Sequence, residues 1–217
     1  MGAEPLLVKR LSGGMPRDLA EVRRRLEAQT AENRIACLNW PAFPYKPEVR
    51  FRIGHVGDEI WLAFSVTESR LRALETRTHG KVHKDCCVEF FLSFDRTNYY
   101  NFECNCIGTP HLAYGPGRAN RTFIPLPLMR RLAVETSLAR EPFGERAGDF
   151  PWFLTARLPL SLFAFDALSS LSGVSASANF YKIASGLSVG HYLTWRPVRT
   201  PAPDYHRPEF FGEIRFE

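Results

Sequence analysis

The sequence predicts an all-β protein, an antiparallel β-sandwich preceded by one short N-terminal helix. Apolar and polar residues alternate along several short segments, and connections rich in Gly and Pro separate these segments. The chain lacks the regular strand–helix alternation of α/β proteins. Aromatic residues make up 13% of the 217 residues, which favours strands. We place residues 1–217 in a single domain, with 1–34 as an N-terminal extension and 35–217 as the sandwich.

One helix is predicted near the N-terminus, over residues 19–30. Asp18 has the side chain of a helix N-cap, and Leu19, Val22 and Leu26 follow at helical spacing as a narrow apolar stripe. The remaining positions are mostly charged. We therefore expect one face of this helix to pack against the protein and the other to face solvent.

Short strands are predicted along the rest of the chain. They cover residues 35–40, 49–53, 60–66, 134–138, 152–158, 175–184, 191–195 and 210–216. Between them, residues 67–84 and 115–132 show no clear periodicity, so we expect two long loops there.

The strongest pattern is a pair of runs at residues 85–95 and 99–108, which alternate with period two. One face is apolar and is formed by Cys86, Val88, Phe90, Leu92, Phe94, Phe102, Cys104 and Cys106. The opposite face carries carboxylates and amides, namely Glu89, Asn101, Glu103 and Asn105. Because this second face does not belong to the core, it is where we expect a functional site.

The register of this strand pair also follows from charge. Placing Glu89 directly opposite Glu103 would set two like charges together, which is unfavourable. The neighbouring register, with Glu89 opposite Asn105 and Phe91 opposite Glu103, avoids this contact and leaves residues 95–99 as the hairpin loop.

Composition restricts the function and location. The net charge of +5 is scattered, and no motif accompanies it, so we expect no nucleic-acid partner. No apolar run reaches the roughly 18 residues of a membrane span, and none resembles a secretory signal, so we expect no membrane insertion. Five Cys, an odd number, favour buried thiols in the cytoplasm, while a processed exported protein stays an open alternative. The oligomeric state stays open.

Several motifs resemble the family 9-like carbohydrate-binding proteins, particularly the subgroup often found in gut Bacteroidetes. They are DCCVEFF at 85–91, YYNFECNCIG at 99–108, PEFFGE at 208–213 and FPYKPEV at 43–49. The resemblance covers residues 35–217. It implies a jelly-roll or DOMON-like β-sandwich that binds a mono- or oligosaccharide on a polar and aromatic sheet face, without catalysis.

The resemblance also implies site residues. Family 9 sugar-binding modules hold a sugar between two Trp rings while polar strand residues bind its hydroxyls. Trp195, Glu89 and Asn105 match one Trp, the strand glutamate and the asparagine of those modules. His83 stands where they carry the other Trp, Glu103 where they carry an arginine, and Tyr181 where they carry a glutamine after the strand asparagine. The predicted carbohydrate site is Trp195, Glu89, Glu103, Asn105, Asn179, Tyr181 and His83.

Two other functions fit the residues. The first is a protein-interaction or accessory sandwich domain with no sugar ligand. The second is a metal-dependent or glycoside-processing enzyme that uses His79, His83 and the carboxylates. We expect no enzyme activity and no cofactor, with structural calcium considered by analogy to the modules.

Overall fold

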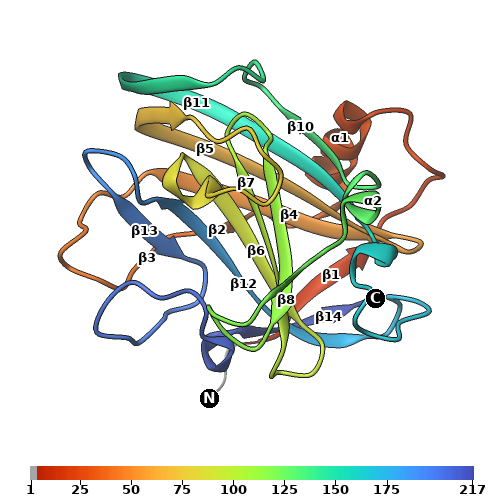
Figure 1. Cartoon of the computed structure of the whole chain (residues 1–217). Coiled ribbons are helices and arrows are strands. Elements are labelled where there is room, and N and C mark those ends of the chain that lie inside the picture. Colours follow the sequence, from red (N-terminus) through yellow and green to blue (C-terminus); the bar gives the residue numbers. More distant parts are fainter. Residues whose placement is uncertain (1–3) are drawn as a thin grey trace.

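The computed structural model describes residues 4–217, and most of its regular structure is β-strand (Figure 1). The strands are β1 (Leu6–Arg10), β2 (Asn33–Arg34), β3 (Cys37–Leu38), β4 (Glu48–Val56), β5 (Glu59–Ala73), β6 (Cys87–Ser93), β7 (Tyr99–Asn105), β8 (Pro110–Gly115), β9 (Thr122–Phe123), β10 (Ala133–Thr136), β11 (Phe143–Pro159), β12 (Ser175–Ala184), β13 (His191–Thr194) and β14 (Gly212–Phe216). The helices are α1 (Leu19–Gln29) and α2 (Leu126–Met129), with 3-10 turns η1 (Val82–Lys84), η2 (Leu160–Leu162) and η3 (Pro208–Phe210).

The strands form one curled sheet, in the order β10-β11-β5-β4-β1-β14-β12-β6-β7-β8-β9, with β13 also paired to β12. Strand β1 runs parallel to both of its neighbours, β4 and β14. The sheet is therefore mixed, and the prediction of a purely antiparallel sheet was wrong at this strand. The sequence LLVKR of β1 does not alternate, and its partners lie far along the chain, so no local pattern reveals the pairing.

The N-terminal helix is confirmed as α1. The Asp18 side chain accepts a hydrogen bond from the backbone N–H of Glu21 at 2.7 Å, which caps the first turn. Val22 and Leu26 are fully buried and pack in a small cluster with Trp61 of β5. The narrow apolar stripe thus attaches the helix to the outer side of the sheet.

Several strands are longer than predicted. β5 continues to Ala73 rather than ending near residue 66, so the loop predicted at 67–84 begins later. The extra length is paired along β11, with two register irregularities. The segment 115–132, predicted as a loop, contains β9 and α2. Polar residues make up most of the added part of β5, residues 67–73. Pairing with the distant strand β11 overrides the local pattern of these residues.

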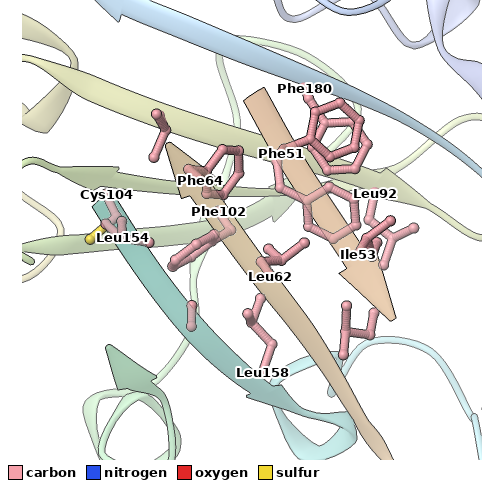
Figure 2. Packing of buried hydrophobic residues seen from close by; sticks show 14 of the residues in the cluster. Phe51, Ile53, Leu62, Phe64, Leu92, Phe102, Cys104, Leu154, Leu158 and Phe180 are labelled. Atoms are coloured by element: carbon pink, nitrogen blue, oxygen red, sulfur yellow. The ribbon is translucent and has the colours of Figure 1, made fainter. Parts of the chain in front are cut away.

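The main core lies between two facing parts of the curled sheet. Strands β4, β5 and β11 form one part, and β6, β7 and β12 form the other (Figure 2). Phe51 of β4 stacks on Phe180 of β12, with their ring centroids 3.8 Å apart. The apolar face predicted for the paired runs at 85–95 and 99–108 is confirmed, because Val88, Phe90 and Phe102 are buried in this core.

A fully buried ion pair lies in the same interior. Lys182 Nζ of β12 lies 2.9 Å from Glu68 Oε2 of β5, and Trp152 Nε1 of β11 donates to Glu68 Oε1 at 2.7 Å. Burial lowers the pKa of His191 to about 2, so its neutral ring can accept a hydrogen bond from Lys182, 2.9 Å away. Burial is the largest single influence on the pKa of Lys182 and lowers it, but the Glu68 carboxylate together with Cys86 and Cys87 outweighs burial and raises this pKa. The pair therefore connects β5 to β12.

We predict that Lys182→Met lowers the free energy of unfolding by about 3–5 kcal/mol, because it leaves the Glu68 carboxylate buried without its cation. Urea unfolding of both proteins at pH 7 measures the difference. The matched control is Arg96→Met, which breaks the exposed Arg96–Glu213 pair and should change stability little. A Lys182→Met protein as stable as the parent would contradict the prediction.

Candidate functional site

Glu89 of β6 and Glu103 of β7 lie directly opposite each other across the strand pair. The predicted register was wrong, since Cys87, not Glu89, pairs with Asn105. The prediction assumed that both carboxyls are charged and solvated. In the structure they are 2% and 6% exposed, and buried carboxyls resist ionisation, which weakens the repulsion between them.

The polar face of β6 and β7 is covered rather than open. Chain segments near residues 40–43 and 198–211 pack over it and form a second apolar cluster, which we call the second core. Its central residues include Trp40, Phe91, Tyr181 and Tyr205, all buried. Both faces of these strands are therefore covered, and polar residues on the second face need partners or a cavity.

A cavity of about 390 Å³ reaches the two carboxyls, and we call it the acidic cavity. It is lined by Phe43, His83, Glu89, Glu103, Arg118, Ile183, Ser185, Tyr192, Pro203, Tyr205 and His206. A site of this size with aromatic walls and a few convergent polar groups is typical of small-ligand binding.

The carboxyl pair forms the acidic part of the cavity lining. Residues directly opposite each other on antiparallel strands have Cβ atoms about 4.5–5.5 Å apart, so the two carboxyls are close neighbours. Burial raises the pKa of Glu89 well above its ordinary value, and the nearby Glu103 raises it further. Burial also raises the pKa of Glu103, although His83, the Asn101 amide and Arg121 partly oppose this. The pair thus retains protons more strongly than exposed carboxyls.

Glu103 is held in place by a relay from the neighbouring loop. Asn101 Nδ2 donates to Glu103 Oε1 at 2.7 Å, and Arg121 Nη2 donates to Asn101 Oδ1 at 2.6 Å. Arg121 also donates to the carbonyls of Tyr99, Ala113 and Gly117, which fixes the 115–121 loop on the edge of β7. No such partner reaches Glu89, whose carboxyl has no hydrogen-bonding partner within residues 4–217.

His83 reaches the cavity from the 3-10 turn η1. Its backbone carbonyl accepts hydrogen bonds from both the backbone N–H and the hydroxyl of Ser185, at 3.0 and 3.1 Å, which ties this turn to the end of β12. Burial lowers the pKa of His83, while Glu103 opposes the shift. The structure therefore brings three of the predicted site residues, Glu89, Glu103 and His83, to one cavity.

Asn105 positions the segment that carries His83. Its amide donates to the Glu75 carbonyl at 2.9 Å and to Asp85 Oδ2 at 3.0 Å, and its oxygen accepts from the Thr109 N–H. Asp85 Oδ2 in turn accepts the Glu75 N–H at 2.9 Å. All of these partners belong to the protein, so Asn105 supports the cavity and does not line it.

Asn179 and Tyr181, on β12, anchor the segment that covers the second face. The Asn179 side chain donates to the Arg196 carbonyl at 3.1 Å and accepts the Arg196 N–H at 2.9 Å. The Tyr181 ring stacks on Tyr205 with centroids 4.1 Å apart, and its hydroxyl donates to the Tyr205 carbonyl. Tyr205 lines the cavity, so Tyr181 holds one of the cavity walls in position. Asn179 fixes the start of the same segment at Arg196.

Trp195 is not among the residues that line the acidic cavity. It packs edge-on against Phe51 and Phe180 of the main core, with centroids 5.9 and 5.5 Å away. The Arg196 guanidinium lies over the Trp195 ring, 4.0 Å from its centroid. One face of this indole is therefore already occupied by a protein side chain.

The sequence did not single out eight residues of the cavity lining, and five of these carry an aromatic or a basic side chain, namely Phe43, Arg118, Tyr192, Tyr205 and His206. Phe43 begins the FPYKPEV motif, but the motif gives it no role in binding. Alternation along β13 is the signal that could have found Tyr192, because its neighbours His191 and Leu193 are buried on the core side. The others lie on loops without periodicity, and only tertiary folding brings them here.

The metal-dependent alternative requires a cluster of metal-ligating side chains. Within the described chain, residues 4–217, no three His, Cys, Asp or Glu side chains converge as metal ligands would. His79 and His83 have separate surroundings, because His79 stacks on Phe123 with centroids 4.9 Å apart while His83 lines the cavity. Residues 4–217 also contain no helix long and apolar enough to cross a membrane.

Comparisons with known proteins point in one direction. A family model described as carbohydrate-binding family 9 matches residues 21–216. The crystal structure of a putative carbohydrate-binding protein from Bacteroides uniformis is 36% identical, with a TM-score of 0.92, and the match covers 99% of both chains. No protein with a curated description matches the chain.

Two more distant structures share the fold. Both are family 9 carbohydrate-binding modules from Caldicellulosiruptor kristjanssonii, one in complex with glucose and one with cellotriose. Each is 13% identical, with TM-scores of 0.60 and 0.62. The matches cover 99% of this chain and 96% and 94% of those chains. At this identity the likeness shows the fold alone.

We predict that Glu89→Gln reduces the loss of stability as pH rises. The unfolded chain releases the Glu89 proton near pH 4.3, the ordinary glutamate value, whereas the folded protein retains it to higher pH. The folded state then binds more protons than the unfolded state, so stability falls as pH rises through this window. Urea unfolding at pH 5 and 7.5 measures the slope, with exposed Glu135→Gln as the matched control. Equal slopes in the parent and Glu89→Gln would contradict the prediction.

Proposed function

The chain belongs to carbohydrate-binding family 9, and from that premise we propose that the acidic cavity is its sugar-binding site. The observation that carries this proposal is the convergence of Glu89, Glu103 and His83 with Phe43 and Tyr192 on one cavity of about 390 Å³. Carboxyl and imidazole groups supply donors and acceptors for hydroxyls, and aromatic rings supply apolar faces for the C–H surface of a pyranose.

The aromatic wall consists mainly of Phe43 and Tyr192. Their rings meet edge-to-face with centroids 4.7 Å apart, and Tyr192 in turn contacts Trp40 at 6.3 Å. This packing fixes the ring positions before a ligand arrives, which reduces the ordering cost of binding. The wall is also partly accessible, since both residues are half-buried. We therefore assign the stacking role to this wall, and Trp195 would need a separate surface.

The ligand we propose is a mono- or oligosaccharide. The glucose and cellotriose complexes of the related modules suggest these two sugars as first probes for this chain. We also propose that the protein binds its sugar without converting it. Membership of a family described as carbohydrate-binding supports this part of the proposal.

The finer fold assignment remains part of the proposal. A jelly-roll or DOMON-like sandwich is supported by the main core, which lies between two facing parts of one curled sheet. Structural calcium likewise remains a prediction.

We predict that the protein binds glucose or cellotriose and that Tyr192→Ala weakens the affinity by about tenfold or more, because one aromatic contact is worth about 1.5 kcal/mol. Titration calorimetry measures the affinity, and circular dichroism checks that the variant folds. The comparison variant is Trp195→Phe, which keeps an aromatic ring in the main core and should bind like the parent.

Two results would contradict this assignment. Loss of binding in Trp195→Phe, with binding retained in Tyr192→Ala, would move the site to the surface around Trp195. Absence of binding to a broad set of glycans would favour the alternative of a protein-interaction domain.

A further inference from the structure

The acidic cavity contains more buried acid than a neutral sugar requires. Two carboxyls face it from adjacent strands, and Glu89 is 2% exposed and has no hydrogen-bonding partner within residues 4–217. A polar group in such a cavity without a protein partner has unused hydrogen-bonding capacity, which a ligand with a suitable donor would satisfy.

The cations near the pair are committed elsewhere. Lys182 points into the main core, where Glu68 and His191 hold it. Arg121 is held by Asn101 and by backbone carbonyls. Arg118, at the exposed rim, is paired with Asp204 at 3.0 Å. None of these three forms an ion pair with Glu89 or Glu103 among the described residues. A positive charge on the ligand would therefore favour the ionised form of this carboxyl pair, whose pKa values burial otherwise raises.

The aromatic wall suits the same ligand. Phe43 and Tyr192 line the cavity together with the two carboxyls. Aromatic faces attract ammonium groups and also pack against the C–H surface of a sugar ring. Hydrogen bonds between charged partners are roughly twice as strong as those between neutral ones, so an ammonium would use the carboxyl pair better than a hydroxyl does.

We infer that the acidic cavity selects a sugar that carries a protonated amine, with Glu89 and Glu103 receiving the ammonium while Phe43 and Tyr192 hold the ring. This inference rests on the proposed function, because it names the class of sugar for the same cavity.

The test compares three sugars of the same ring size, namely glucose, glucosamine and N-acetylglucosamine, by titration calorimetry at pH 6.5 and low salt. We expect glucosamine to bind about tenfold more tightly than glucose, since hydrogen bonds between charged partners are stronger than those between neutral partners. N-acetylglucosamine keeps the nitrogen but removes its charge, and it should bind no more tightly than glucose.

Variants then assign the preference to the carboxyl pair. Glu103→Gln should reduce the ratio of glucosamine to glucose affinity to less than about threefold, because it removes one carboxyl that can ionise beside the ammonium and keeps the side-chain shape. Glu89→Gln is the second variant and should do the same if Glu103→Gln fails to fold. The matched control, Glu135→Gln, changes an exposed glutamate on β10 and should retain the full ratio.

The outcomes separate the two proposals. Equal affinity for glucose and glucosamine would overturn the amine preference and leave the sugar site standing. A preference for glucosamine that survives in both Glu89→Gln and Glu103→Gln would also overturn it, because the carboxyls would not be its source. If neither these three sugars nor cellotriose binds, the proposed function fails together with the inference.

Discussion

The buried contact between Glu68 and Lys182 is the interaction on which the arrangement of this protein depends. It joins β5, in one part of the curled sheet, to β12 in the part that faces it. Two fully buried charges tolerate little displacement, since each loses its compensation if the strands separate. Strand β12 pairs with β6, β13 and β14, so its position sets the position of all three. The acidic cavity lies on the opposite side of these strands, so its shape depends on the same strand positions.

Strands β6, β7 and β12 are covered on both faces, and this explains why the cavity contains acids with raised pKa values. The inner face contributes Phe90 and Phe180 to the main core, while the outer face lies beneath segments that arrive from residues 40–43 and 198–211. A carboxyl on an open sheet would be solvated and charged. Beneath this cover, Glu89 and Glu103 favour protons or a ligand as partners. The cover thus converts a polar strand face into a cavity lined by two carboxyls.

The residues predicted from the family resemblance divide according to what they do in the structure. Glu89, Glu103 and His83 line the cavity. Asn105, Asn179 and Tyr181 hold the segments that surround it, through hydrogen bonds to backbone groups. Trp195 packs against the main core beneath Arg196. A match to a family motif therefore selected residues that line or surround one cavity, but it did not distinguish residues that line the cavity from residues that support it.

The sequence by itself determined the features that local pattern controls. Period-two alternation assigned the core and second faces of residues 85–108, and Asp18 with its apolar stripe located the helix. Only the tertiary structure decided the register of Glu89, the parallel pairing of β1 and the lining of the cavity. The register of β6 and β7 depends on whether the carboxyls of Glu89 and Glu103 are solvated. Their solvation depends in turn on the distant segments that cover them. Likewise, Phe43, Tyr192 and His206 meet through long-range packing, which no local pattern encodes.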